Sequence, residues 1–380
     1  MGDRKKIALT YYYSENWIAG AYYVANIISA INSLDDVEKP EIYLVHSRME
    51  GLELIKNINY PYINFIPDSP DLYSFWERIS NRFASFFGKG EYYLRKKLKG
   101  VNCIFEGNNR FSFIPRHFFW VHDFQQCRMP HFFTEEEAQN RSSLPAKVAK
   151  LSDAVLILSS YDAKNDFQTY FPDYKCSISV LRFASTLPDF SGRDIKVLKE
   201  KYGIVNPYFI CSNQFWQHKN HWLVLKALKR LKDSGSHSFQ IVFTGKNYDF
   251  RNPDYFDQLK SFVEENSLTD IVKFLGFIDR DEQLCLGANS ISYIQPSLFE
   301  GWSTTVEDVK ALNQFILLSD IPVHREQMND NVLFFDPYNE ADLAEKMQIV
   351  LNGKTNKIVT DYNKNIRGFG KDILEAFKVN

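Results

Sequence analysis

The sequence lacks the features that mark several large classes of protein. Its five cysteines are scattered and form no C-x-x-C pair, and no His/Cys cluster has zinc spacing, so neither a disulfide framework nor a structural zinc site is expected. The formal net charge is only −2, which gives no general attraction to nucleic acid. No uninterrupted apolar run reaches the length of a membrane span. These absences favour an ordinary globular protein.

Cysteine placement and the first residues suggest where such a protein works. Cys103, Cys176 and Cys211 lie in or beside strand-like runs, which favours free, buried thiols in a reducing compartment. The first apolar run, residues 7–13, is too short for the core of a signal peptide. We therefore expect a cytoplasmic protein.

Three familiar catalytic motifs are also missing. There is no G-x-S-x-G, no G-x-x-x-x-G-K-[ST] and no G-x-G-x-x-G, so a serine hydrolase, a P-loop ATPase and a dinucleotide oxidoreductase lose their usual support. Asp279 and Asp281 spell D-x-D, a pattern that can hold a divalent metal on a diphosphate. One of them sits where the following helix needs an N-cap, so we expect no metal and no cofactor.

What the sequence does contain is a regular alternation of strand-like and helix-like runs, as in a doubly wound α/β fold. Its 380 residues are enough for two domains. In the first half, strands are expected over residues 7–13, 41–46, 101–105, 118–121, 154–158 and 177–181. In the second half, they are expected over residues 208–212, 240–244, 272–275, 290–294, 315–318 and 332–335. Helices are expected from the loop at residues 16–20 to residue 32 and over residues 161–170, 220–232, 255–265, 282–286 and 340–351.

This alternation predicts two Rossmann-like domains that face a cleft. We place the first domain at residues 1–187, a linker with proline, serine and glycine at 188–204, and the second domain at 205–352. Residues 353–380 are expected to form a tail or helix that packs back toward the first domain. In such folds ligands bind at the carboxyl ends of the strands.

The most informative stretch is residues 296–311. It follows a short apolar run at 292–295 and contains Glu300 and Gly301 just before a helix. Three hydroxyl residues crowd the start of that helix: Ser303, Thr304 and Thr305. A helix N-terminus carries a positive partial charge and unpaired N–H groups that suit a phosphate. With Asp308 further along, the stretch offers phosphate donors between two carboxylates, as a sugar nucleotide would need. Glu307 is expected to form a capping box with Thr304.

Other chemistry-bearing residues also follow predicted strands. Lys219 comes after the strand at 208–212, where it can reach a diphosphate as a mobile point charge. His122 follows another strand, although an isolated histidine is more often structural. Gly245 and Gly276 end two further strands, where the backbone can approach a ligand closely.

Residues 76–99 break the charge balance, because basic and aromatic side chains alternate there with few acids. A basic, aromatic helical stretch can lie on an anionic membrane surface. A solvated helix face that packs on its own domain is an equally good interpretation.

Residues 213–221, 275–277 and above all 296–327 resemble the family-4 retaining glycosyltransferases of the GT-B fold. The resemblance is strong over residues 205–352 and weaker over the first half. It implies metal-independent transfer of a sugar, with retention, from a nucleotide-diphosphate donor to a hydroxyl of a glycan or lipid-linked acceptor. The usual setting of such enzymes is surface polysaccharide assembly, which would place this protein in the cytoplasm or at the inner face of the membrane.

The resemblance also implies roles for single residues. Glu300 would bind hydroxyls of the donor sugar, Asp308 the ribose, and His122 the sugar near the bond that breaks. Lys219 and the amides of the three hydroxyl residues would hold the diphosphate. The remaining positions implied to contact the donor are Asn16, Gly20, Asn213, Gln214, Gly245, Gly276 and Gly301. Ser159 and Ser160 would be minor candidates.

Two positions depart from the family pattern. The second acid of its Glu-x7-Glu signature is here Asp308, and Gln214 stands where the family often has an arginine. These departures motivate a competing hypothesis, a sugar-nucleotide-binding subunit without catalysis. A GT-B-fold epimerase that acts on the donor, and a metal-dependent transferase that uses the D-x-D, also compete with a retaining transferase.

Overall fold

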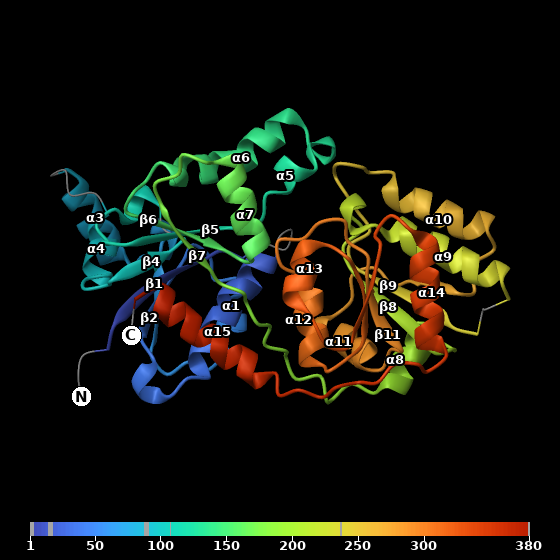
Figure 1. Cartoon of the computed structure of the whole chain (residues 1–380). Coiled ribbons are helices and arrows are strands. Elements are labelled where there is room, and N and C mark those ends of the chain that lie inside the picture. The colour runs from blue at the N-terminus through green and yellow to red at the C-terminus, as the bar shows by residue number, and fades with distance from the viewer. Residues whose placement is uncertain (1–3, 14–17, 87–90, 107, 236–237, 379–380) are drawn as a thin grey trace.

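The protein consists of two α/β lobes that lie side by side (Figure 1). The computed structural model describes residues 4–13, 18–86, 91–106, 108–235 and 238–378. Each lobe is built on one sheet, and every strand pair within the described residues is parallel. Parallel strands need crossover connections, and helices supply most of them.

The first domain contains a seven-stranded sheet in the order β3-β2-β1-β4-β5-β6-β7. Its strands are β1 (Lys6–Tyr11), β2 (Glu41–His46), β3 (Ile63–Pro67), β4 (Cys103–Phe105), β5 (His117–Val121), β6 (Ala154–Leu158) and β7 (Ser177–Val180). Its helices are α1 (Ile18–Asn32), α2 (Leu52–Lys56), α3 (Phe75–Phe86), α4 (Tyr92–Lys97), α5 (Gln125–Arg128), α6 (Glu135–Ala149) and α7 (Tyr161–Tyr170). The strand order reverses direction between β1 and β4, which is where doubly wound sheets take ligands.

The second domain contains a six-stranded sheet in the order β10-β9-β8-β11-β12-β13. Its strands are β8 (Tyr208–Ser212), β9 (Gln240–Thr244), β10 (Val272–Phe274), β11 (Ser292–Gln295), β12 (Ile316–Ser319) and β13 (Val332–Phe335). Its helices are α8 (Ile195–Lys201), α9 (His221–Asp233), α10 (Tyr255–Glu265), α11 (Arg280–Ala288), α12 (Thr304–Ala311), α13 (Pro322–Gln327) and α14 (Glu340–Leu351). Here the order reverses between β8 and β11, the strands that precede Lys219 and Glu300.

The chain crosses between the domains twice. The first crossing follows β7, and the second follows α14 and leads to the last helix, α15 (Asn363–Ala376) (Figure 1). Helix α15 packs beside α1, and Phe369, Ile373 and Phe377 belong to the core of the first domain. Gly370 lies so close to α1 that an added Cβ would collide with the carbonyl oxygen of Ala30. The last helix therefore completes the first domain.

Hydrophobic burial explains which elements the sequence predicts well. The strands at 41–46, 154–158, 208–212, 240–244 and 332–335 are confirmed to the residue, as are the helices at 161–170, 255–265 and 340–351. Asn339 caps the last of these helices by accepting hydrogen bonds from the N–H groups of Ala341 and Asp342. All five cysteines are free, and Cys103, Cys176 and Cys211 are buried as expected.

Several expectations at element boundaries differ from the structure. No strand is expected at β3, which lies at the edge of the sheet and ends at Pro67; an edge strand tolerates proline. Gly20 lies inside α1, which begins at Ile18, rather than in a loop before the helix. Buried residues such as Ile27, Ile28 and Ile31 hold that helix on the core despite the glycine.

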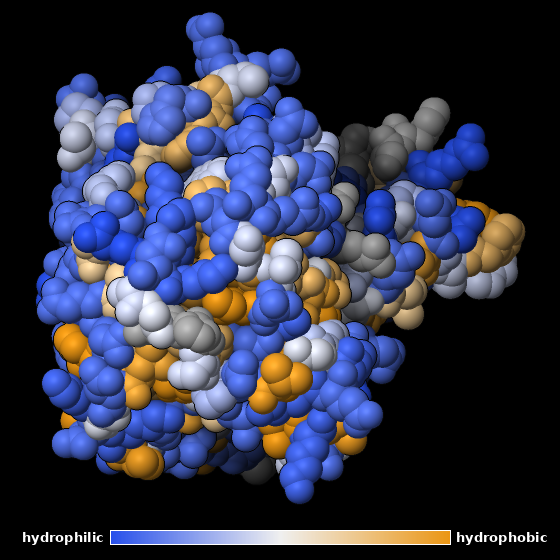
Figure 2. All heavy atoms as spheres, turned by 90° about the vertical axis from the view of Figure 1, so that its right-hand side faces the viewer, coloured by the Kyte–Doolittle hydropathy of each residue, from blue (hydrophilic) through white to orange (hydrophobic). Residues whose placement is uncertain are grey.

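The outer face of the second domain is mostly hydrophilic. Hydrophilic side chains cover most of the face turned away from the first domain, and hydrophobic ones show between them in separate patches (Figure 2). Among the described residues, no helix is long and apolar enough to cross a membrane. The features that could carry chemistry lie instead where the two domains meet.

Candidate active site between the domains

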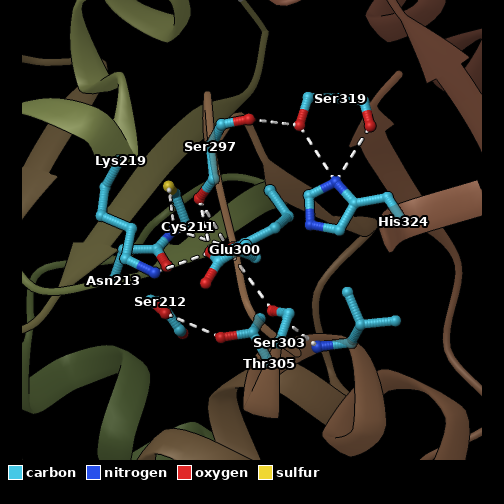
Figure 3. Close-up of polar contacts among 12 residues, drawn as sticks. Cys211, Ser212, Asn213, Lys219, Ser297, Glu300, Ser303, Thr305, Ser319 and His324 are labelled. Carbon is cyan, nitrogen blue, oxygen red and sulfur yellow. Dashed lines mark hydrogen bonds and ion pairs between the residues drawn. The ribbon is translucent and has the colours of Figure 1, made fainter. Parts of the chain in front are cut away.

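Glu300 is the centre of a hydrogen-bond network in the second domain (Figure 3). Its Oε1 atom accepts hydrogen bonds from Lys219 Nζ at 2.6 Å, Ser297 Oγ at 2.7 Å and Gln295 Nε2 at 2.8 Å. Lys219 comes from the loop after β8 and Glu300 from the loop after β11, and these strands are neighbours in the sheet. The sheet thus brings together the two residues that the sequence singles out for sugar and diphosphate.

Gln295 is a site residue that sequence reasoning missed. It is fully buried at the end of β11 and joins two loops, because its Oε1 accepts from Asn213 Nδ2 at 2.8 Å while its Nε2 donates to Glu300. This places Asn213, an expected donor-site residue, one side chain away from Glu300. The sequence signal for Gln295 was a polar residue within the apolar run of a buried strand. A buried amide needs hydrogen-bond partners, so such a residue indicates a polar network nearby.

Helix α12 begins beside Glu300, and Ser303 is its N-cap. Ser303 Oγ accepts from the N–H of Val306 at 3.4 Å, while Thr305 Oγ1 donates to the carbonyl of Ser212 at the end of β8. Thr304 is exposed. The N–H groups of a first turn have no partner within the helix, so this terminus offers donors and a positive partial charge beside Glu300.

The expected capping box between Thr304 and Glu307 is wrong. Glu307 is buried, and its carboxylate accepts from Lys310 Nζ at 2.9 Å, Gln327 Nε2 at 2.9 Å and Tyr362 Oη at 2.5 Å. The helix starts one residue earlier than a capping box requires, because Ser303 takes the N-cap position. Glu307 is therefore free to turn inward, where three donors compensate its burial.

Asp308 faces a different neighbour. Its Oδ1 lies 2.5 Å from Nη2 of Arg280, the first residue of α11. Burial raises the pKa of the Asp308 carboxyl, and the guanidinium of Arg280 opposes this shift. Arg280 Nη1 also donates to Gln283 Oε1 at 2.9 Å. The second acid of the signature is thus engaged in an ion pair that the sequence alone did not indicate.

His122 and Gly301 bring the two domains into contact at the site. His122 follows β5 of the first domain, and a Cβ added to Gly301 would collide with the carbonyl oxygen of His122. Burial lowers the pKa of His122 to about 4, so its imidazole is neutral at pH 7. Trp302 Nε1 donates to the carbonyl of Phe183 at 3.0 Å, a second contact from the same loop to the first domain.

The remaining expected donor-site residues lie at the strand ends or outside the described residues. Gly245 and Gly276 follow β9 and β10, and the N–H of Gly245 donates to the carbonyl of Gly276 at 2.8 Å. Gly245 packs so tightly that an added Cβ would collide with the carbonyl of Asn213. Gln214 follows Asn213 in the same loop and is half-buried. Asn16 lies outside the described residues.

Ser159 and Ser160 have structural partners in the first domain. Ser159 Oγ accepts from Trp120 Nε1 at 3.2 Å. Ser160 is the N-cap of α7, and its Oγ accepts from the N–H of Ala163 at 3.0 Å. Both hydroxyls are buried, and these contacts account for them.

His324 is a second buried residue that the sequence did not single out. Its Nδ1 lies 2.9 Å from the carbonyl oxygen of Ser319, so Nδ1 carries the proton (Figure 3). Ser319 Oγ donates to the carbonyl of Ser297, whose own hydroxyl donates to Glu300. Burial lowers the pKa of His324 to about 4, which keeps it neutral. The network therefore braces Glu300 from the side of β12.

The two aspartates of the D-x-D pattern lie apart from this network. Asp279 occupies the N-cap position of α11, although its side chain makes no capping hydrogen bond. Asp281 forms an ion pair with Arg193 at 2.7 Å. No group of three or more metal-ligating side chains occurs within the described ranges.

A cavity of about 210 Å³ opens next to Glu300. Its lining comes from both domains: Arg128, Met129 and Asp162 from the first, and Leu298, Phe299, Glu300, Ile321, Pro322, Val323 and Tyr338 from the second. Arg128 is held by Asp162 at 2.6 Å and Asp166 at 2.7 Å. The site therefore has a charged wall in the first domain and a mostly apolar wall in the second.

Comparison with known proteins identifies the second domain. Residues 194–369 match the family model described as glycosyl transferases group 1. These residues form a group 1 glycosyltransferase domain. The chain is 27% identical over 221 residues to the O-antigen chain mannosyltransferase RfbU of Salmonella typhimurium, a match that covers 58% of this chain and 56% of that protein. The match thus spans little more than half the length of this curated relative.

Solved structures establish the fold of the whole chain. HepE of Anabaena, in complex with UDP and glucose, superposes with a TM-score of 0.63 at 14% identity, over 99% of this chain and 96% of that one. WaaG, a glycosyltransferase involved in lipopolysaccharide biosynthesis, gives a TM-score of 0.61 at 10% identity, over 99% of both chains. The two Rossmann-like domains are those of the GT-B fold, as the sequence predicts.

Proposed function

We propose that this glycosyltransferase moves a sugar from a nucleotide-diphosphate donor to a hydroxyl acceptor with retention and without a metal. The observation that carries the proposal is the Lys219–Glu300 pair beside the N-terminus of α12, at the junction of the two domains. It combines a cation and helix amides for a diphosphate with a carboxylate for sugar hydroxyls. In the absence of donor, the two charges compensate one another in a largely buried position.

Each group has a distinct part in the proposed transfer. Glu300 binds donor sugar hydroxyls, and the network of Gln295 and Ser297 holds it in place. Lys219 leaves Glu300 for the diphosphate, where it and the first-turn amides of α12 stabilise the charge that develops as the bond to the sugar breaks. His122, neutral at pH 7, contacts the sugar from the first domain. A phosphate oxygen takes the proton of the attacking hydroxyl on the same face.

Names of similar proteins support the choice of substrates. HepE was crystallised with UDP and glucose, which favours a nucleotide sugar as donor. RfbU is an O-antigen chain mannosyltransferase and WaaG takes part in lipopolysaccharide biosynthesis, which favours a cytoplasmic role in surface polysaccharide assembly, with a glycan or lipid-linked acceptor. We propose no role for nucleic acid.

The decisive experiment follows the donor by NMR with and without acceptor. UDP-, GDP- and dTDP-linked hexoses are incubated with the wild type and with Glu300→Ala. Transfer to an acceptor, reduced at least about tenfold (about 1.4 kcal/mol of transition-state stabilisation) in the variant, supports the proposal. Isomerised donor without acceptor would identify an epimerase, and binding without turnover a non-catalytic subunit. Loss of activity in EDTA would refute metal independence.

We also propose that α3 and α4 dock on an anionic membrane surface. Four large apolar side chains of α3 are exposed, with Trp76 at 74% and Phe83 at 67%, together with Phe75 and Ile79. Arg78 and Arg82 lie on the same helix. Helix α4 adds further cations but packs on its own domain through Tyr93 and Leu94. These helices lie at the end of the first domain that is remote from the second (Figure 1).

Vesicle sedimentation tests this docking. Trp76→Ser with Arg82→Gln should weaken binding to vesicles of phosphatidylglycerol and phosphatidylcholine in equal parts by at least about tenfold, since each cation near such a surface contributes about 1 kcal/mol. Lys226→Gln with Arg230→Gln on α9 is the matched control. Equal binding by both pairs, or equal binding of the wild type to pure phosphatidylcholine, would contradict the proposal.

A further inference from the structure

We propose that Arg280 is the side chain that meets the nucleoside diphosphate part of the donor, and that Asp308 acts through it as a positioning residue. This inference rests on the proposed function, because it concerns the nucleotide of the same donor. It differs from the role that the sequence resemblance implies, in which the acid at position 308 binds the ribose itself.

The order of the two side chains in the cleft is the first argument. The Asp308 side chain is only 6% exposed, whereas that of Arg280 is 26% exposed. The carboxylate oxygen Oδ1 is covered by Nη2 of Arg280 at 2.5 Å. Aspartate is also one methylene shorter than the glutamate of the family signature. A ligand that approaches this wall therefore meets the guanidinium before it meets the carboxylate.

The second argument is that Arg280 is held in a fixed orientation. Arg280 donates from Nη2 to Asp308 Oδ1 and from Nη1 to Gln283 Oε1. An arginine side chain has five N–H donors, so the described residues accept only some of them. Gln283 is itself placed by Thr244 Oγ1, at 3.4 Å, at the end of β9. A guanidinium oriented in this way loses little side-chain entropy when it binds an anion.

The third argument is location. Arg280 begins α11, which follows β10, and its partner Asp308 lies on α12 one turn from the helix start that we assign to the diphosphate. Arg280 lies near the carboxyl end of β9, because its partner Gln283 donates to Thr244 Oγ1 there. Carboxyl ends of strands at such a cleft are where doubly wound sheets bind nucleotides. Arg280 supplies there the cation that Gln214 does not.

A double-mutant cycle tests the inference. Affinities of the intact protein for UDP, GDP and dTDP are measured by titration calorimetry for the wild type, Arg280→Gln, Asp308→Asn and the double variant. Each single change should weaken the better-bound nucleotide about tenfold, the loss of one charge-assisted contact. The double variant should bind no more weakly than Arg280→Gln, because Asp308 has no separate contact to lose. Since it also removes the unpaired buried charge, it guards against misfolding of the single variants.

Three outcomes decide the matter. Equal affinities for Arg280→Gln and the double variant support the inference. Losses that multiply in the double variant would show that Asp308 contacts the nucleotide itself, and a double variant that binds like the wild type would show a purely structural ion pair. Arg193→Gln with Asp281→Asn, another ion pair of α11, is the matched control and should leave the affinity unchanged. If the wild type binds neither UDP, GDP nor dTDP, it is the proposed function that fails.

Discussion

Replacing Lys219 by methionine should affect stability and catalysis in separable ways. The change keeps most of the length of the side chain but removes the cation from Glu300. Oε1 of Glu300 then retains the hydrogen bonds from Gln295 and Ser297 and loses a charge-assisted one, which is worth about 1.5–3 kcal/mol. The cost should stay below the roughly 3–5 kcal/mol typical of a fully orphaned buried charge. We expect the free energy of unfolding to fall by about 2 kcal/mol.

A second change distinguishes the two effects. Glu300→Gln added to Lys219→Met removes the orphaned charge and should restore most of the stability. Turnover should remain at least about a hundredfold below wild type, because the cation on the developing charge and the carboxylate for the sugar hydroxyls are both gone. Urea unfolding gives the stability, and nucleotide release gives kcat.

Lys310→Met supplies the matched control for this cycle. Lys310 pairs with Glu307, which is also buried, and neither side chain lines the cavity next to Glu300. This change should cost comparable stability and leave turnover near that of the wild type. If Lys219→Met keeps wild-type kcat, or if its catalytic loss is no larger than that of Lys310→Met, then Lys219 does not act on the diphosphate.

Two further predictions concern domain contact and pH. Gly301→Ala should reduce kcat at least about tenfold, because its Cβ would collide with the carbonyl of His122 where the two domains meet. The stability of each domain should change little. An unchanged rate would show that turnover does not need the close contact between Gly301 and His122. Burial raises the pKa of Glu106 from 4.5 to about 7, so the folded protein binds more protons than the unfolded chain between these values and stability falls as the pH rises through them. Glu106→Gln should therefore gain up to about 3 kcal/mol relative to wild type between about pH 5 and pH 8, measured by denaturation at both; a constant difference would contradict the shift.

How far the sequence predicts this structure depends on how local each signal is. Strands such as β8 and β9 are apolar runs whose five residues are all buried, so periodicity and turn residues locate them to the residue. Strand β3 is only partly buried and contains a proline, so its local pattern is weak. It is held in the sheet by its pairing with β2, which local sequence does not reveal. Lys219 and Glu300 are 81 residues apart, yet both follow strands, and the carboxyl ends of neighbouring parallel strands share one edge. That is why this pair was predictable.

Side-chain partners that depend on tertiary packing were not predictable in this way. Two of the three partners of Glu307 come from α13 and from the second crossing, and that of Asp308 comes from α11. Nothing in the local spacing of Thr304 and Glu307 distinguishes a capping box from an inward-turned acid. His324 looks ordinary in sequence, and for Gln295 the sequence shows only a polar residue in an apolar run; the buried network around Glu300 reveals which residues they hold.

The two adjacent acids on α12, Glu307 and Asp308, contact different parts of the molecule because neighbouring residues of a helix point about 100° apart. Asp308 faces the cleft, where Arg280 covers it. Glu307 faces the chain crossings, since Tyr362 of the second crossing donates to it and the same hydroxyl accepts from the N–H of Ser185 in the first, at 3.0 Å. Both connections between the domains therefore converge on the helix whose N-terminus we assign to the diphosphate. A rotation of one domain on the other would strain these hydrogen bonds, and through them it would act on the helix that carries the phosphate donors.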